Sequence, residues 1–360
     1  MIELPDHPRI LVITLRRLGD VLLTTPLVRT LREGLSGARI DALVFRGTEG
    51  MLAGNPDIAE IIAVPQRPTL RETLALRRRL WRRYDLAVAT QSGDRPIIAA
   101  LMAGRRRIGL VPSDGRGAWW KRLALHGAVS ADPENHRLFE LSRLAQCLGL
   151  SRIPDLVCPR GAASAPAVQG RYAVVHANPM YRYKRWTDAG WRELAEALRA
   201  RGLAVVATGG PDAGERAYLD RVWEGQSPPV RRLDGKLGWP ELADLLRGAA
   251  VFIGTDTSVT HLAAGSGCPT VALFGPTSPQ LIGPWPVGGL REPWRPAGTI
   301  QHRGNVWVVQ NPLPCLPCEK LGCAGHLDSH ARCLDELGVA QVLRAVDAAL
   351  AGRAAVPAST

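Results

Sequence analysis

The sequence has few lysines and no long hydrophobic segment. Only 4 of the 45 basic residues are lysine, so arginine, whose planar guanidinium suits bidentate contacts with phosphate and carboxylate groups, supplies most of the positive charge. No apolar run approaches the ~18 residues that a transmembrane helix needs. The N-terminus carries Glu3 and Asp6 and has no basic segment or hydrophobic stretch of the signal-peptide kind. We therefore expect a cytoplasmic protein.

Three nucleotide-handling motifs are also missing. The chain has no Gly-x-x-x-x-Gly-Lys loop and no Gly-x-Gly-x-x-Gly after its first predicted strand, which argues against NTP hydrolysis and dinucleotide redox chemistry. It has no Asp-x-Asp either, the usual carboxylate pair that holds a divalent ion on a sugar nucleotide. A bound diphosphate would therefore depend on protein cations and helix N-termini.

The chain is long and apolar enough to form two folded domains. It has 360 residues, of which 46% are hydrophobic and 22% charged, as in globular proteins. Its net charge of +12 indicates an acidic partner. Residues 1–160 hold 25 Lys+Arg against 16 Asp+Glu, a net charge of +9, which leaves +3 for residues 161–360. Since no nucleic-acid-binding module or aromatic–basic stacking pattern is present, we expect no nucleic-acid partner.

Short apolar runs of the buried-strand type alternate with helical patterns in both halves of the chain. They occur at residues 9–15, 38–45, 58–64, 85–90 and 107–111, and again at 172–177, 203–210, 251–255 and 269–276. This alternation predicts an α/β protein with two doubly wound, Rossmann-like domains that face each other across a cleft. We predict a first domain at 1–155, a Pro-, Ala-, Gly- and Ser-rich linker at 156–170, a second domain at 171–335, and at 336–360 a helix that packs back on the first domain.

Ligands of such sheets bind beyond the carboxyl ends of the strands, so functional residues should directly follow strands. The first such segment is RRLGDVLLTTPL, residues 16–27, which contains Asp20. One interpretation is that Asp20 caps the following helix, because aspartate is a preferred N-cap residue. The other is that its carboxylate is a general base at the edge of the cleft.

Three more segments follow strands of the second domain. HANPMYRYKRWTDAGW, residues 176–191, contains Lys184, which is either a solvated cation or a point charge that meets a phosphate. The turn at Gly209 and Gly210 would let the backbone approach a ligand. The last segment is FIGTDTSVTHLAAG, residues 252–265. Its hydroxyl and imidazole groups stand at a predicted helix start, an arrangement that fits a diphosphate better than a neutral ligand.

Four of the seven cysteines lie close together near the C-terminus. They are Cys315, Cys318, Cys323 and Cys333. Four thiolates are enough for a tetrahedral structural zinc ion, but the second Cys-x-x-Cys of a zinc ribbon is missing. Free thiols in a reducing compartment are the alternative.

Together these segments resemble the lipopolysaccharide heptosyltransferases of glycosyltransferase family nine, which have the GT-B fold. The similarity extends over nearly the whole chain. It is carried by RILVITLRRLGDVLLTTPLVRTLRE, NPDIAEIIAV, GRRRIGL, HANPMYRYKRWTDAGW, VATGGPDAGER and, most specifically, FIGTDTSVTHLAAGSGCPTVALFGPTSPQLIGP. The resemblance implies an inverting, metal-independent glycosyltransferase that moves heptose from ADP-L-glycero-D-manno-heptose to the inner core of lipopolysaccharide.

The resemblance also implies residue roles. Asp20 matches the family's general base, and Lys184 matches the cation that contacts the donor phosphates. The predicted donor-binding set is Asn178, Lys184, Gly209, Gly210, Leu237, Asp256, Thr257, Ser258 and His261. Within it, Ser258 stands where the family usually has glycine, and Leu237 falls where the family packs an apolar side chain against adenine.

The acceptor side is predicted from charge. Arginines that follow or connect first-domain elements would meet the carboxylates and phosphates of an anionic lipopolysaccharide core. They are Arg16, Arg17, Arg105, Arg106 and Arg107; a solvated basic face is the alternative. We expect the protein at the cytoplasmic face of the inner membrane, in peripheral contact with it. The alternative function is a GT-B transferase that uses another nucleotide sugar for O-antigen, glycan or protein modification.

Overall fold

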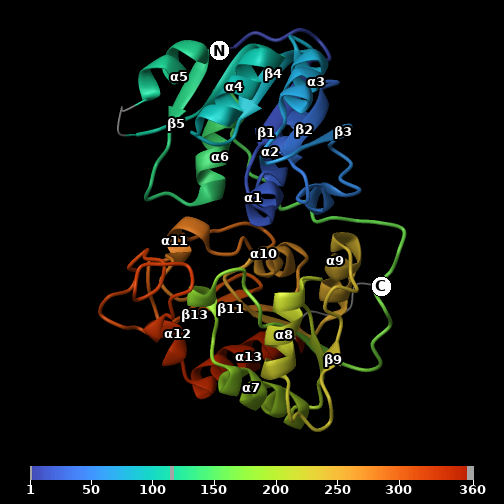
Figure 1. Ribbon diagram of the computed structural model, residues 1–360, viewed down its shortest axis with the longest axis vertical. Coiled ribbons are helices and arrows are strands. Elements are labelled where there is room, and N and C mark those ends of the chain that lie inside the picture. The colour runs from blue at the N-terminus through green and yellow to red at the C-terminus, as the bar shows by residue number, and fades with distance from the viewer. Residues whose placement is uncertain (1, 114–116, 355–360) are drawn as a thin grey trace. The chain divides into compact units, whose positions relative to one another are not determined.

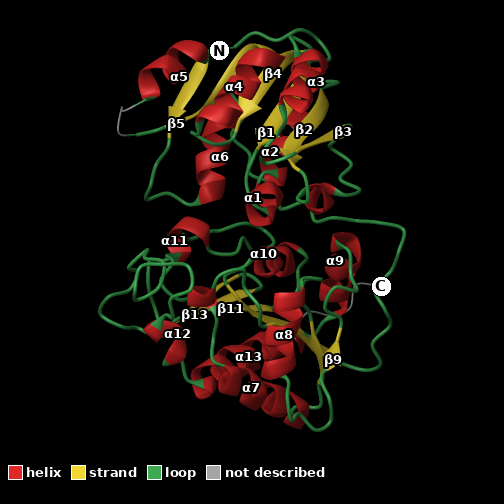
Figure 2. Ribbon diagram, in the orientation of Figure 1, coloured by secondary structure: helices red, strands yellow, loops and turns green. Residues whose placement is uncertain are grey.

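The computed structural model describes residues 2–113 and 117–354, and the chain divides into two compact units between Pro159 and Arg160. Each unit has a mainly parallel β-sheet with helices on both faces (Figures 1 and 2). Among the described residues, no helix has the length and apolar character needed to cross a bilayer.

The first unit is built on a parallel sheet of strand order β3-β2-β1-β4-β5-β6. Its elements are β1 (Arg9–Thr14), α1 (Leu18–Leu23), α2 (Thr25–Gly34), β2 (Arg39–Phe45), η1 (Glu49–Leu52), β3 (Glu60–Val64), α3 (Leu70–Leu80), β4 (Tyr84–Ala89), α4 (Asp94–Ala103), β5 (Gly104–Val111), α5 (Ala118–Ala124), β6 (Gly127–Ser130) and α6 (Arg137–Gln146). This is the Rossmann strand order, which reverses between β1 and β4.

Alternating side chains of each strand separate the core of the first unit into two layers. Ile10 and Val12 of β1 pack with helices α2 and α6, whereas Leu11 and Ile13 pack with α3, α4 and α5. The helical segment after β1 is divided at Thr24 into α1 and α2. Pro26 has no N–H to continue the ladder, and the Thr25 hydroxyl donates to the Leu22 carbonyl instead, at 2.8 Å.

The second unit repeats this arrangement with a sheet of order β12-β13-β11-β10-β7-β8-β9, in which β12 pairs antiparallel with β13. Its elements are β7 (Tyr172–His176), η2 (Arg182–Lys184), α7 (Asp188–Ala200), β8 (Ala204–Ala207), α8 (Ala213–Val222), β9 (Arg231–Arg232), α9 (Trp239–Gly248), β10 (Val251–Thr255), α10 (Ser258–Gly265), β11 (Thr270–Leu273), α11 (Pro279–Ile282), β12 (Ile300–Arg303), β13 (Val306–Val309), α12 (Arg332–Asp335) and α13 (Val339–Ala354). Its order reverses between β7 and β10. The β12–β13 hairpin has no counterpart among the strands predicted from the sequence.

The C-terminal helix differs from its prediction. Helix α13 belongs to the second unit, where Val342 and Val346 enter the same core as β11, β13 and α7. The expectation that it packs back on the first domain is therefore wrong. The apolar stripe of the helix is used on the sheet that directly precedes it in the chain.

No helix or strand occurs between Gln146 and Tyr172, the region in which we predicted the linker. Its first part is bound to the first unit, since the Val157 N–H donates to the Thr25 hydroxyl at 2.9 Å. Its second part is bound to the second unit, because the Ala165 N–H donates to Asp244 at 3.0 Å. The change from one unit to the other thus takes place within a few residues of Pro159.

Candidate functional site

Each unit has polar side chains at the strand reversal of its sheet, where α/β proteins bind ligands. In the first unit, Asp20 is the third residue of α1, the helix that follows β1. Arg17 occupies the N-cap position and no side-chain cap bond is present there, so the interpretation of Asp20 as the N-cap is wrong. Asp20 Oδ1 lies 3.3 Å from Arg16 Nη1 and 3.8 Å from Arg137 Nε, and the Asp20 side chain is 20% exposed.

Arg137, which the sequence analysis did not single out, organises the surroundings of Asp20. It is the first residue of α6 and is buried. Its Nη1 donates to Glu140 Oε2 at 2.6 Å and its Nη2 to the Thr90 carbonyl at 2.5 Å. These bonds fix the guanidinium beside Asp20. The Arg-x-x-Glu spacing at a helix start was the only sequence signal of this pair.

A cavity of about 420 Å³ opens beside this cluster. It is lined by Leu15, Arg16, Gln91, Ser92, Gly93, Pro96, Leu110, Ala131, Arg137 and Glu140. Most of these residues follow the carboxyl ends of β1, β4 and β6 or begin α6. The cavity has the volume of a small-molecule site, and its guanidinium groups suit an anionic ligand.

The predicted acceptor arginines separate into two groups. Arg16 lines the cavity and Arg17 begins α1 beside it. Residues 105–107 belong to the start of β5. They therefore lie near the amino ends of the strands, opposite to the carboxyl ends that border the cavity. Arg106 is level with Ile10 across β4, six residues before Arg16, which corresponds to roughly 20 Å along a strand. The structure does not bring Arg105, Arg106 and Arg107 to the cavity, because they lie at the amino end of β5 whereas the cavity lies at the carboxyl ends of the strands.

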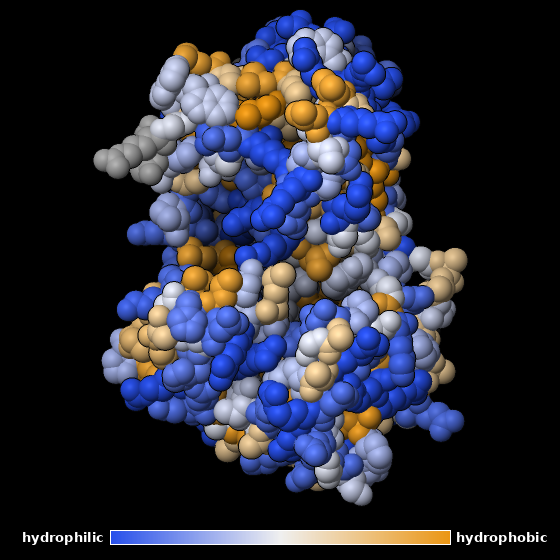
Figure 3. Space-filling view, viewed as in Figure 1, coloured by the Kyte–Doolittle hydropathy of each residue, from blue (hydrophilic) through white to orange (hydrophobic). Residues whose placement is uncertain are grey.

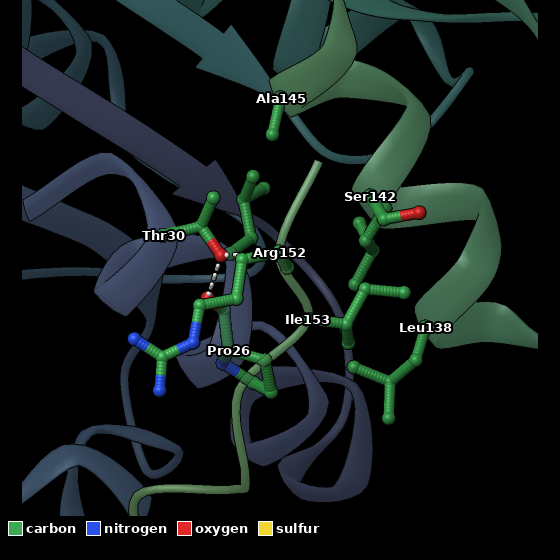
Figure 4. A pocket seen from close by; sticks show the side chains of 9 residues that line it. Pro26, Thr30, Leu138, Ser142, Ala145, Arg152 and Ile153 are labelled. Atoms are coloured by element: carbon green, nitrogen blue, oxygen red, sulfur yellow. Dashed lines mark hydrogen bonds between the residues drawn. The ribbon is translucent and has the colours of Figure 1, made fainter. Parts of the chain in front are cut away.

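A second cavity of the first unit lies between α2, α6 and the segment after α6 (Figure 4). It measures about 10 Å³, the space of a single water molecule. The hydroxyl of Thr30 donates to the Arg152 carbonyl at its edge, at 2.9 Å (Figure 4). It is a packing gap rather than a ligand site.

In the second unit, the strand reversal brings Lys184 and Asp256 together. Lys184 ends η2 after β7, Asp256 follows β10, and the two form an ion pair. Their side chains are 16% and 6% exposed. In this environment of low dielectric, the pair holds the ammonium in place more firmly than a surface ion pair would.

Helix α10 begins directly after this ion pair. Thr257 is its N-cap, and its hydroxyl accepts from the Thr260 N–H at 3.4 Å. Ser258 is the first helical residue, and His261 is buried within the first turns. The free N–H groups and positive dipole end of such a helix start suit an anion. The carboxyl ends of β7 and β10 therefore bring together Lys184, Asp256 and the 257–261 segment, as predicted.

Four other residues were predicted to bind the donor, and the structure places each of them in a loop after a strand or before a helix. Asn178 is buried and accepts from Arg185 Nη2 at 3.3 Å. Leu237 is half-buried just before α9. The two glycines after β8 are required by local packing: a Cβ at Gly209 would lie 2.5 Å from Leu219 Cδ1, and Glu215 fills the space beside Gly210.

Residues 73–288 match the family model described as glycosyltransferase family 9 (heptosyltransferase). The chain belongs to this family. A curated relative, lipopolysaccharide heptosyltransferase 3 of Escherichia coli, is 31% identical over 288 residues, which cover 74% of this chain and 83% of the relative.

The family's solved structures have the same two-domain fold. The glycosyl transferase family 9 protein from Veillonella parvula superposes with a TM-score of 0.78 at 19% identity, covering 98% of this chain and 99% of that one. The E. coli heptosyltransferase WaaC with ADP-2-deoxy-2-fluoro heptose gives 0.69 at 19% identity, covering 94% and 99%. The GT-B fold and the family expected from the sequence are confirmed.

In this family 9 glycosyltransferase, a further acidic residue, Glu319, lies near the Lys184–Asp256 ion pair. It was not predicted from the sequence. Glu319 Oε1 accepts from the Ser278 N–H at 2.6 Å, in the turn after β11. Partial burial of the carboxyl raises the pKa of Glu319 and the hydrogen bond from the Ser278 N–H lowers it; the negative charge of Asp256 raises it and Lys184 lowers it. The last two effects place Glu319 within electrostatic reach of the Lys184–Asp256 pair. Nothing in the sequence of the cysteine-rich segment predicted this proximity.

The four C-terminal cysteines have free thiols. Burial and the nearby Cys318 and Cys323 raise the pKa of Cys333 to about 12. In residues 2–113 and 117–354, no three His, Cys, Asp or Glu side chains are arranged to hold a metal ion. The structural zinc therefore stays a prediction.

His176 gives the second unit a defined pH dependence. It ends β7, and burial lowers its pKa to about 4. The unfolded chain takes up this proton at about pH 6.5 while the folded chain does not, so stability falls as the pH decreases from about 6.5 toward 4. Relative to His176→Gln, the free energy of unfolding of the wild type should fall by about 2 kcal/mol as the pH decreases from about 6.5 to 5. Urea unfolding of both proteins measures this. A constant difference over that range would show that His176 titrates normally.

Proposed function

We propose that the chain transfers heptose from ADP-L-glycero-D-manno-heptose to the inner core of lipopolysaccharide, with inversion at the anomeric carbon and without a metal ion. The observation that carries this proposal is the Lys184–Asp256 ion pair at the amino end of α10, a ready diphosphate site. Family membership supports heptosyl transfer, and a related structure contains an ADP-heptose analogue.

In the proposed reaction, Asp20 accepts a proton from an acceptor hydroxyl. The hydroxyl oxygen forms a bond to the anomeric carbon of the donor as the bond from that carbon to the diphosphate oxygen breaks. ADP leaves with the electron pair and its added negative charge. Lys184 and the N–H groups at the start of α10 stabilise this charge. Attack from the face opposite ADP inverts the anomeric configuration.

The residues around Asp20 support its role as the base. The side chain is partly exposed next to the cavity, so a hydroxyl can reach it. Arg16 and Arg137 hold the carboxylate in position, and Arg16 also offers a donor group to an acidic acceptor. A fixed carboxylate within hydrogen-bond reach of the proton is the geometry that general-base catalysis needs.

Purified protein tests the proposal directly. It is incubated with ADP-heptose and with lipopolysaccharide from a strain whose inner core lacks the added heptose. Mass spectrometry should detect one added heptose, and NMR of the product should give the inverted anomeric configuration. Undiminished transfer after treatment with a chelator is expected. Preference for a different nucleotide sugar, or for a glycan or protein acceptor, would establish the alternative GT-B function instead.

A basic–apolar face on the first unit supports peripheral contact with the membrane. Helices α3, α4 and α5 cover one face of the sheet and neighbour one another. Their large exposed hydrophobic side chains, with that of Trp81 at the end of α3, are Leu70, Leu74, Trp81, Ile98, Leu101, Trp119 and Leu123. Figure 3 shows hydrophobic and hydrophilic groups side by side over these helices.

Exposed arginines accompany these hydrophobic residues. They are Arg71, Arg77, Arg78, Arg79, Arg82, Arg83, Arg105, Arg106 and Arg122. Trp and Leu side chains insert at a membrane interface, while each arginine gains about 1 kcal/mol beside anionic lipid. We propose that this face docks on an anionic leaflet. Arg105 and Arg106 then contact lipid rather than the acceptor sugar.

Charge reversal tests the docking face. Arg77→Glu with Arg78→Glu should weaken binding to vesicles of anionic phospholipid at least ~10-fold, because two attractive charges become repulsive. Added salt should weaken wild-type binding in the same way. Arg216→Glu, an exposed arginine of the second unit, is the matched control. Vesicle sedimentation that is insensitive to salt and to the double substitution would contradict the docking face.

A further inference from the structure

Glu319 has a backbone conformation that its side chain does not favour. Its φ is +53°, in the left-handed region where glycine and asparagine are the usual residues. A glycine would make the same turn without the steric cost of a Cβ. Residues held in such conformations concentrate at functional sites, and here the side chain has specific contacts.

Two hydrogen bonds attach Glu319 to the turn after β11. Its N–H donates to the Pro276 carbonyl at 3.0 Å, and its Oε1 accepts from the Ser278 N–H at 2.6 Å. Strand β11 neighbours β10, the strand that Asp256 follows. The segment that contains Glu319 is thereby fixed at the carboxyl edge of the second sheet, the edge that also holds Lys184.

The second carboxylate oxygen, Oε2, has no hydrogen bond within the part of the chain that the structure describes. Glu319 as a residue is exposed to solvent, although surrounding atoms partly desolvate its carboxyl. Lys184 is already paired with Asp256. A diphosphate at Lys184 would repel another carboxylate facing it, since like charges at close range are unfavourable in a partly desolvated site. Hydroxyl groups, by contrast, donate well to a carboxylate.

We propose that Glu319 is a donor-sugar-binding residue: Oε1 fixes the 276–278 turn, and Oε2 accepts a hydrogen bond from a hydroxyl of the sugar being transferred, next to the diphosphate at Lys184. This inference rests on the proposed donor site. In this arrangement, the hydroxyl groups of the donor sugar bind the Glu319 carboxylate, and the donor phosphates bind Lys184 and the start of α10.

Calorimetric titration with ADP and with ADP-heptose, without acceptor, separates the two parts of the donor. Glu319→Gln keeps the shape of the side chain but loses its charge. It should bind ADP within about twofold of wild type and ADP-heptose about 10-fold or more weakly, because hydrogen bonds to charged groups are the strong ones. Glu292→Gln, an exposed carboxylate of the same unit, is the control and should bind both ligands normally.

Glu319→Gly separates the side chain's role from that of the backbone. Glycine relieves the left-handed conformation, so the unfolding midpoint should not fall, while ADP-heptose binding should still weaken about 10-fold. Normal ADP-heptose binding by either variant would overturn the proposal. Equal weakening for ADP and ADP-heptose would also overturn it, since the carboxylate would then act on the nucleotide. Failure of the wild-type protein to bind ADP-heptose would refute the proposed function itself.

Discussion

Replacing Asp20 with asparagine should reduce the rate of heptosyl transfer by about 10²–10⁴-fold, the usual contribution of a general base. Asparagine is nearly the same size as aspartate and can still accept hydrogen bonds from Arg16 and Arg137. It cannot take a proton from the acceptor. Asp20 is not the helix cap, so the substitution should lower stability by no more than the ~1 kcal/mol of a first-turn charge on the helix dipole.

Glu72→Gln is the matched control for this variant. Glu72 is the third residue of α3, as Asp20 is of α1, and it lies outside the cavity lining. Initial rates at saturating donor, with the unfolding midpoint of each variant, give the comparison. Asp20→Asn with wild-type kcat would remove Asp20 from the reaction. A large fall in the unfolding midpoint would show that its interaction with Arg137 is structural.

Replacing Lys184 with glutamine should lower kcat/KM by about 10²–10³-fold, because a preorganised cation that faces the leaving diphosphate is lost. The effect should appear in kcat as well as in KM, since negative charge on ADP increases toward the transition state. Lys184→Arg restores a positive charge with a different shape and should recover part of the activity.

The buried partner of Lys184 requires its own control. Removing the ammonium leaves the Asp256 carboxylate, 6% exposed, without its ion-pair partner, which destabilises a protein by about 3–5 kcal/mol in typical cases. The double variant Lys184→Gln/Asp256→Asn removes both charges and should recover stability without recovering activity. Lys236→Gln, an exposed lysine of the same unit, should remain active. Recovery of transfer in the double variant would contradict a direct role for Lys184.

The features that depend on local sequence were predictable. The alternation of strands and helices, the change of domain near residue 159 and the helix start at Thr257 can each be predicted from a short segment of sequence. Lys184 and Asp256 were predicted to share a site because each follows a strand, and the sheet places these two strands, β7 and β10, side by side.

The features that depend on distant contacts were not predictable. Arg137 reaches Asp20 only because β4, β5 and β6 are ordered side by side. Glu319 reaches the turn at Ser278, near Lys184 and Asp256, through a segment without regular secondary structure. The β12–β13 hairpin turns at Gly304 and Asn305 within a Pro- and Trp-rich region whose composition conceals the strands.

The division of the chain at Pro159 and Arg160 also has an evolutionary consequence. The proposed acceptor groups come from residues before this boundary and the proposed donor groups from residues after it. Each sheet has its own core and its own strand reversal. A single recombination between related genes at this boundary would therefore exchange the recognised glycan and leave the chemistry of the sugar nucleotide intact.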